Sequence, residues 1–391
     1  MALLNLYLTS NQSLSKEQLV KVHPRWTQKQ LIAIEVILAN LMFYQDYKVL
    51  FESRNKANVL PKYNPLGVGH KAMLGAIEKL SEGNFIKLTK GTRRLQKDEE
   101  TLPMLSEIQL KAKGLRLCLE LNITAETVQR IEAEHHLYLK EPDEKGGMVI
   151  EYTEDEYSLA TEKLMTEYND FLRQQTIKCK GEVFDNPLVK RNYRNLDNSK
   201  LLKFGGRSGG LWHQLGKEER KFITINGIKT ASCDYKSSVI NILYLIETNQ
   251  MLGRGVDGYA VEGIPRDIVK VMVNRMLNNA SQQGATLAFS KWLKTSANKD
   301  QRFFMKHRTI ASVQKAILAH HPKIAHHFFK GKAHGQRIAW VEANAVFTVA
   351  QQLALMGVPV LTVHDEFICK KEDEELVWEV MYSTYVDYKN I

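Results

Sequence analysis

Two aspartates interrupt apolar segments that otherwise have the composition of buried strands. Asp234 lies in the run Ala-Ser-Cys-Asp-Tyr-Lys-Ser-Ser-Val-Ile at 231–240, and Asp365 lies in Val-Leu-Thr-Val-His-Asp-Glu-Phe-Ile at 360–368. An unpaired charge is costly to bury, so a carboxylate in such a run normally meets a cation or takes part in chemistry. We therefore expect a fold that brings these two distant segments to a common site.

Two carboxylates of this kind can hold a pair of divalent metal ions. Mg²⁺ prefers hard oxygen ligands and is usually held by one or two carboxylates together with substrate phosphates. A pair of such ions is the arrangement that enzymes use for nucleotidyl transfer. The residues thus suggest a polymerase palm with two Mg²⁺ ions as cofactors, which Mn²⁺ can replace.

The segments around both aspartates predict hairpins. Asn226-Gly227 separates two β-rich runs, the second of which ends near Asp234, and helical spacing resumes at 239–245. Further on, a helix is expected at 340–356, followed by a hairpin at 358–371 with Asp365 at its tip. Polar residues at a hairpin tip are ordinary turn chemistry, and this reading would suffice if Asp365 stood alone.

A helix predicted over 264–280 carries a polar row. Its sequence begins with a proline at a plausible first helical position. Helical geometry places Arg266, Lys270, Asn274 and Asn278 on one face at successive steps of four. The ordinary interpretation is a solvated face, and the functional one is a row of side chains that binds a triphosphate.

Two basic segments are candidate contacts to nucleic acid. The run Lys-Phe-Gly-Gly-Arg-Ser-Gly-Gly at 203–210 is too rich in glycine for a regular helix and lets the backbone approach a phosphate closely, with Arg207 as the contact. A flexible turn is the alternative. Gln336 and Arg337 precede the helix predicted at 340–356 and are candidates for a template backbone, although a plain basic loop explains them equally well.

The bulk composition fits a partner with many negative charges. The 54 Lys and Arg against 44 Asp and Glu give a formal charge of +10, which favours a polyanion. The four cysteines lack a spacing typical of zinc or disulfides, no Walker-type phosphate loop is present, and no apolar stretch reaches the roughly 20 residues of a membrane helix. We expect a cytoplasmic protein without a membrane partner. Its oligomeric state is left open.

The chain is expected to have two parts and an α+β fold. Residues 1–183 show helical periodicity and predict a mostly helical, thumb-like region, whereas 184–391 predict the catalytic part, with an antiparallel sheet and further helices. The histidine pairs 135–136, 320–321 and 326–327 lie side by side, so we expect surface or hydrogen-bonded histidines that do not converge on one ion.

The order of the motifs resembles a known family. Asp-Tyr-Lys-Ser at 234–237, then Arg266 and Lys270 on a helix, then Val-His-Asp-Glu at 363–366 resemble motifs A, B and C of the DNA polymerase I family, family A. The resemblance covers about residues 200–391 and implies a right-hand palm with helical fingers. It also implies DNA polymerase activity on a primer–template, with nucleoside triphosphates as substrates and without a proofreading exonuclease.

Carried over residue by residue, the resemblance implies a role for each matching position. Asp234 and Asp365 would ligate the metals with the backbone carbonyl of Tyr235, and Glu366 would be an auxiliary acid. His364 would lie near the primer terminus. The motif B cations would bind the incoming phosphates, and Lys270 is also a candidate proton donor to pyrophosphate.

Two departures from the family pattern keep alternatives open. Val239 stands where DNA-synthesising members carry a glutamate that excludes a ribose 2′-hydroxyl, and Asn274 and Asn278 stand where the family has an aromatic residue and its neighbours. RNA polymerase or primase-like synthesis on the same palm, with RNA as a partner, is one alternative. A non-catalytic protein that binds nucleic acid is the other.

Overall fold

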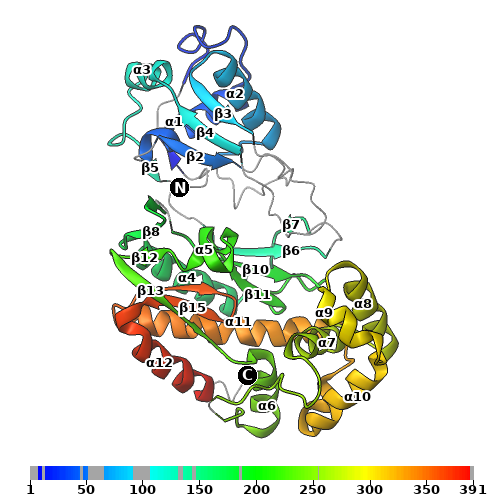
Figure 1. Ribbon diagram of the computed structural model, residues 1–391. Helices are drawn as coiled ribbons and strands as arrows, with labels where there is room; N and C mark the ends of the chain where they lie inside the picture. Colours follow the sequence, from blue (N-terminus) through cyan, green and yellow to red (C-terminus); the bar gives the residue numbers. More distant parts are fainter. Residues whose placement is uncertain are drawn as a thin grey trace.

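The protein has a mixed α+β fold, as the sequence predicts, and is about half helical with several sheets, including a curled antiparallel half-barrel. A computed structural model describes residues 8–10, 14–44, 47–51, 66–90, 106–130, 135–142, 147–184, 187–253 and 255–387. Within these ranges the side chains form two separate hydrophobic cores, which divide the chain between Val128 and Leu137. Figure 1 shows the two parts, with the N-terminal one at the top.

The N-terminal part combines helices with short strands. Helix α1 starts after Thr27, whose side chain accepts a hydrogen bond from the Gln30 backbone while the Gln30 side chain bonds back to Thr27. The helices pack on a three-stranded antiparallel sheet of order β2-β4-β3. The elements of this part are β1 (Leu8–Thr9), α1 (Gln28–Phe43), β2 (Lys48–Phe51), α2 (His70–Glu82), β3 (Ile86–Thr89), β4 (Ser106–Leu110), α3 (Ala112–Glu120) and β5 (Gln129–Arg130).

A six-stranded antiparallel sheet is the centre of the second part. Its order is β14-β15-β13-β12-β8-β9, and every pair along it is antiparallel. The turn at Asn226-Gly227 joins β12 and β13 as predicted, with positive φ at both residues. The strands are β8 (Ile177–Cys179), β9 (Glu182–Val183), β12 (Ile223–Ile225), β13 (Ile228–Asp234), β14 (Val360–Val363) and β15 (Glu366–Lys370).

A second sheet of order β11-β10-β6-β7 lies next to the long helix α11, which contacts β11, β14 and four helices (Figure 1). Its strands are β6 (Leu137–Lys140), β7 (Val149–Ile150), β10 (Lys190–Arg194) and β11 (Gly205–Gly209). The helical segments of this part are α4 (Glu156–Arg173), η2 (Leu211–Gln214), α5 (Lys217–Arg220), α6 (Ser238–Thr248), α7 (Arg266–Asn278), α8 (Gln282–Thr295), α9 (Lys299–Lys306), α10 (Ile310–His320), η3 (Pro322–His327), α11 (Lys332–Leu355), η4 (Lys371–Asp373) and α12 (Glu374–Asp387).

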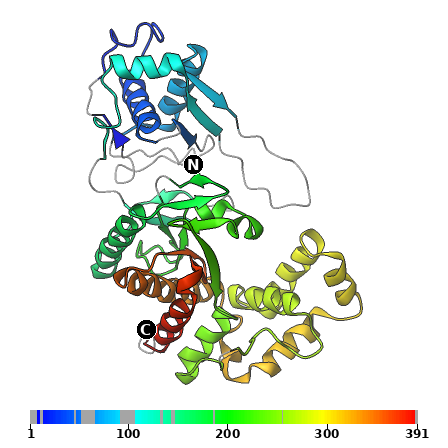
Figure 2. The ribbon, with the colours of Figure 1, turned by 60° about the vertical axis from the view of Figure 1, so that its left-hand side comes forward.

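Helices α7 to α10 stand as a lobe beside the sheets, which is clear in Figure 2. The chain enters this lobe after α6 and leaves it through η3 into α11. Pro265 is the N-cap of α7 and so lies one position before the helix. The sequence had predicted it at the first helical position. No helix in the described ranges has the length and apolar character needed to cross a membrane.

The N-terminal region differs from the sequence expectation in two ways. The described residues within 1–183 are not mostly helical, because strands β1 to β9 lie among helices α1 to α4. The change of hydrophobic core also comes earlier than residue 183, since α4 and β8 contribute Met165, Leu172 and Ile177 to the core of the second part. Strands of two to five residues leave little alternating pattern in a sequence, which is why helical periodicity dominated the prediction.

Candidate active site

Pairing of β13 with β15 brings the two aspartate segments together. In this antiparallel register Asp234 lies opposite Glu366, and Asp365 occupies the turn just before β15. The backbone N–H of Tyr235 donates to the backbone carbonyl of Asp365 at 3.4 Å. Two residues that are far apart in the sequence therefore meet at one end of the sheet.

The two aspartates experience a strongly negative local field. Partial burial, Glu342 and Asp234 together raise the pKa of Asp365 from 3.8 to about 7. Partial burial and the neighbouring Glu366 also raise the pKa of Asp234, and Lys270 opposes the rise at both aspartates. Clustered carboxylates that repel one another in this way are stabilised by a divalent cation. Oxygen donors of this type fit Mg²⁺.

Glu342, which the sequence analysis missed, is a major source of this field. It lies on α11 and is 2% exposed. Arg207 of β11 donates to its Oε2 atom from Nε at 3.0 Å and from Nη2 at 2.5 Å. Arg207, predicted as a nucleic-acid contact, is thus held by a buried acid close enough to affect the field at Asp365. The sequence feature that could have indicated Glu342 is that it is the single acid within the largely apolar sequence of α11.

Glu366 is oriented by two neighbours on the sheet side of the site. Its Oε1 atom accepts a hydrogen bond from Ser232 Oγ at 2.5 Å, and its Oε2 atom lies 3.3 Å from Arg220 Nη2. Ser232 belongs to β13 and Arg220 to α5. Glu366 therefore has its own cation, whereas the charges of Asp234 and Asp365 are offset mainly by Lys270.

Helix α7 places the two predicted phosphate-binding cations next to the acids. Arg266 forms an ion pair with Asp257, and its guanidinium lies 5.4 Å from the centre of the Tyr259 ring. Lys270, one turn further along, is exposed. Both cations act on the pKa of Asp234. Both residues are exposed, but Arg266 is already paired with Asp257.

The other residues predicted around the nucleotide occupy different settings. Asn278 Nδ2 donates to the Asn274 backbone carbonyl at 3.0 Å and to Asn274 Oδ1 at 2.9 Å, so the two amides bond to each other. Val239 is partly buried against the hydrophobic core at the start of α6. The Tyr235 side chain is buried, and its hydroxyl donates to the Met381 carbonyl at 2.7 Å.

His364 lies in the hairpin turn beside Asp365 with a positive φ of 57°. Its ring centre is 5.8 Å from that of His213, in an edge-to-face arrangement. Partial burial and the nearby Arg207 lower the pKa of His364. The imidazole is therefore neutral at pH 7 and able to accept or donate a hydrogen bond at the site.

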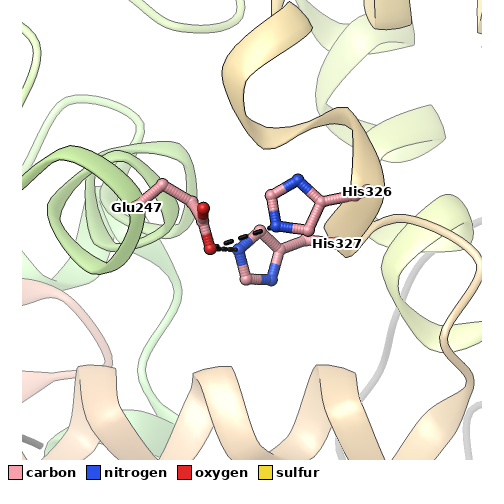
Figure 3. Close-up of side chains that lie close together, drawn as sticks. All are labelled: Glu247, His326 and His327. Atoms are coloured by element: carbon pink, nitrogen blue, oxygen red, sulfur yellow. Dashed lines mark hydrogen bonds and ion pairs between the residues drawn. The ribbon is translucent and has the colours of Figure 1, made fainter.

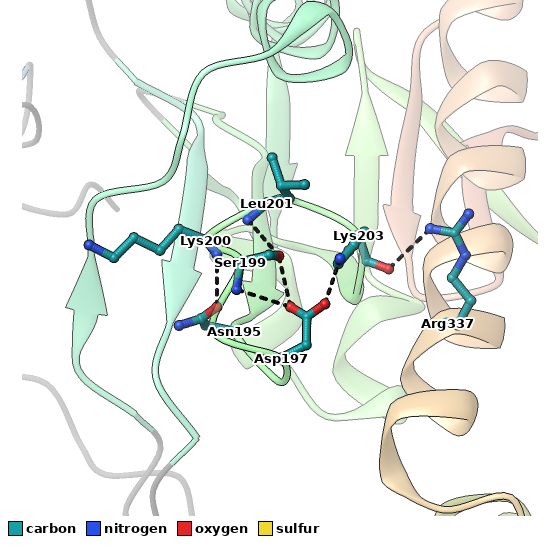
Figure 4. A network of polar contacts seen from close by, with 7 residues as sticks. All are labelled: Asn195, Asp197, Ser199, Lys200, Leu201, Lys203 and Arg337. Carbon is teal, nitrogen blue, oxygen red and sulfur yellow. Dashed lines mark hydrogen bonds and ion pairs between the residues drawn. The ribbon is translucent and has the colours of Figure 1, made fainter.

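Gln336 and Arg337 lie on α11 against β11 and the loop that precedes it. A Cβ at Gly205 would lie 3.4 Å from Gln336 Oε1. Arg337 donates to the Lys203 backbone carbonyl at 3.4 Å and stacks over Trp340 at 4.1 Å. Figure 4 shows the loop at 195–203, in which the Asp197 carboxylate accepts a hydrogen bond from Ser199 and forms an ion pair with Lys203. Arg337 thus contacts this loop and Trp340 of its own helix, and Gln336 lies beside Gly205 of β11.

Comparisons with known proteins do not identify the chain. No protein-family model matches it, and a search of curated proteins finds no similar sequence. The assignment of a function therefore depends on the chemistry of the site. That site combines two adjacent aspartates of raised pKa, an accessible lysine and a neighbouring arginine at one end of the antiparallel sheet.

Proposed function

We propose that this protein is a DNA-directed nucleotidyltransferase that extends a primer 3′-hydroxyl by phosphoryl transfer. The observation that carries the proposal is the convergence of Asp234 and Asp365 beside Lys270 and Arg266. A nucleotidyltransferase needs acids that hold metal ions at the reacting phosphorus and cations that bind the rest of the triphosphate. Both kinds of residue are present, and they come from the sheet and from α7 respectively.

Asp234, Asp365 and the carbonyl of Tyr235 are the groups proposed to hold two Mg²⁺ ions, which Mn²⁺ can replace. When bound, such ions activate the attacking hydroxyl and neutralise charge on the leaving pyrophosphate. The raised pKa of Asp365 supports this assignment, because a carboxyl that keeps its proton near pH 7 without a cation will exchange it for one. Glu366, held by Ser232 and Arg220, would act as an auxiliary acid beside them.

The chain's own cations would bind the incoming nucleotide. Lys270 is accessible and would contact the triphosphate and give a proton to the leaving pyrophosphate. Arg266 would have to exchange Asp257 for a phosphate, so nucleotide binding would loosen the ion pair at the start of α7. Asp257 also accepts a hydrogen bond from Ser237, the residue before α6. The nucleotide would thereby be coupled to the segment that follows Asp234.

RNA or primase-like synthesis on the same site is the second candidate, and Val239 favours it. Its side chain is apolar and partly buried against the core, so it offers no hydrogen bond to a sugar hydroxyl. The two candidates separate by the sugar of the triphosphate that is incorporated.

The N-terminal part supports a duplex nucleic acid as partner. Helices α1 and α2 pack on the sheet of order β2-β4-β3, and exposed cations on these elements are available to phosphates. Lys71 on α2 and Lys87 on β3 are exposed. We expect Lys71→Glu with Lys87→Glu to weaken binding to a closed, end-free duplex several-fold, and the same change at Lys163 of α4 to have no effect.

Primer extension tests the proposal. The wild-type chain is given a primed DNA template, Mg²⁺ and either deoxy- or ribonucleotides, and the products are separated on a gel. Asp234→Asn and Asp365→Asn should abolish extension while duplex binding persists, and Asp170→Asn on the exposed face of α4 is the matched control. Turnover in either site variant refutes the assignment. Binding by the wild type without incorporation of either sugar selects a non-catalytic nucleic-acid-binding protein.

A further inference from the structure

A second group of titratable side chains includes the C-terminal end of α6, the helix whose N-terminal end follows Asp234. Glu247 is near the end of α6, His326 and His327 end η3, and His334 lies in the first turn of α11. Figure 3 shows the two imidazoles of η3 pointing to the same carboxylate oxygen of Glu247. The sequence analysis expected adjacent histidines not to converge on one ion, and for this pair the structure corrects that expectation.

The geometry of this cluster is that of three donors around one point. The Nε2 atoms of His326 and His327 lie 3.1 Å and 2.7 Å from Glu247 Oε1. One ligand atom from each of the three residues lies within 4.8 Å of the others. Zinc–ligand bonds of about 2.0–2.2 Å place tetrahedral donors roughly 3.3 Å apart. Small side-chain rotations are enough to reach such spacing.

His334 provides the outer contact that metal-bound imidazoles usually have. Its Nε2 atom lies 3.1 Å from His327 Nδ1, and the two rings stack with centroids 5.2 Å apart. A ligating histidine normally bonds through its second ring nitrogen to a neighbour, which fixes its tautomer and orientation. His327 is thus placed between a carboxylate oxygen and a second imidazole.

Burial and neighbouring charges act on the pKa values of His327, His334 and Glu247. Burial and the nearby His326 and Lys330 lower the pKa of His327, against the opposing effect of Glu247, and burial also lowers that of His334. Although partial burial acts to raise it, hydrogen bonds from His327 and His326 hold the pKa of Glu247 below its ordinary value.

We propose that Glu247, His326 and His327 bind a Zn²⁺ ion, with His334 as a positioning residue. Two imidazoles and a carboxylate, with a water molecule in the fourth position, suit Zn²⁺ better than Mg²⁺, which prefers oxygen donors only. The ion would join η3, and through His334 the start of α11, to α6. It would therefore hold together the segment through which the lobe of α7 to α10 leads into α11. This role is independent of the proposed catalytic metals.

Metal titration of the full chain tests this site. The chelator-treated protein is titrated with Zn²⁺ by calorimetry and with Co²⁺ by visible absorption, in excess Mg²⁺ to occupy the aspartates. The wild type should bind one equivalent and give the intense absorption of tetrahedral Co²⁺. Glu247→Gln and His326→Ala should each weaken binding by about 100-fold or more, and His334→Ala by about 10- to 100-fold. His320→Ala, exposed on α10, should bind as the wild type.

The His326→Ala variant should fold as the wild type does, because the His326 side chain is 57% exposed and its loss leaves no cavity. A loss of metal binding in this variant therefore reports on the site. Wild-type affinity in both Glu247→Gln and His326→Ala would overturn the proposal. So would the absence of tetrahedral Co²⁺ absorption in the wild type, which would leave a hydrogen-bonded cluster alone. Since the catalytic aspartates are not involved, the primer-extension result is separate from either outcome.

Discussion

Replacing Asp365 by asparagine should stabilise the metal-free protein while it abolishes activity. The pKa of Asp365 rises from 3.8 to about 7 in the folded chain, chiefly through burial and the field of Glu342. In the unfolded chain the carboxyl returns to its ordinary value. The folded state therefore binds more protons than the unfolded state between about pH 4 and pH 7, and its stability falls as the pH rises through that window.

The size of the effect follows from the difference between the two pKa values. At 1.36 kcal/mol per pKa unit, a carboxyl that titrates at about 7 instead of 3.8 lowers the free energy of unfolding by about 4 kcal/mol above pH 7. At pH 5 the folded carboxyl is still protonated, and the loss is about 2 kcal/mol. Asparagine carries no charge at either pH. We expect Asp365→Asn to exceed the wild type in stability, by an amount that grows with pH.

Urea denaturation in the presence of a chelator, at pH 5 and pH 8, measures this difference. Tryptophan fluorescence follows mainly the second part, because Trp26 is the one of the five tryptophans that belongs to the N-terminal hydrophobic core. Asp170→Asn is the control, since Asp170 is exposed and pairs only with Arg173 among its described contacts. Added Mg²⁺ should then stabilise the wild type at pH 8 and leave Asp365→Asn unchanged. A variant that is no more stable than the wild type at pH 8 refutes the reasoning.

Three further predictions concern other residues of the proposed site. Lys270→Ala should raise the KM for the triphosphate by about 10- to 100-fold, as expected for a lost charged hydrogen bond, whereas Lys163→Ala should not; steady-state kinetics measure both. Val239→Glu should shift the ratio of deoxy- to ribonucleotide incorporation, and an unchanged ratio would show that this position does not face the sugar. Arg207→Met leaves Glu342 buried without its cation and should cost about 3–5 kcal/mol of stability in urea denaturation. Adding Glu342→Gln should recover most of that loss, and a double variant no more stable than the single one would argue against the pair.

The local features of the sheet could be predicted from the sequence because they depend on residues close in the chain. Asn226-Gly227 adopts the positive φ angles that a tight hairpin needs, and this turn sets the strand that ends at Asp234. The hairpin around Asp365 follows from two apolar runs on either side of a polar turn. Once both hairpins are given, an antiparallel pairing of β13 with β15 places the acids together.

The electrostatic partners of the site could not be predicted in this way. Arg207 and Glu342 are 135 positions apart, and Arg220 and Glu366 are 146 apart. Which acid meets which base depends on how α11 and α5 pack against the sheets, and no local period or spacing encodes that packing. The short strands of the N-terminal part were not predicted for a related reason. Four-residue strands such as β2 and β3 have too few positions to show an alternating pattern.

Both candidate sites show that an acid from a distant helix decides what a local motif can do. Glu342 on α11 raises the pKa of Asp365. Its negative charge thereby favours a cation at the hairpin turn. Glu247 on α6 brings together His326 and His327, which adjacency in the sequence had suggested would diverge. In each case the acid stands among mostly apolar residues of its helix. For Glu342, which is buried, this position is costly unless the acid meets a cation, so a buried acid of this kind marks the face of a helix that lies against other charged groups.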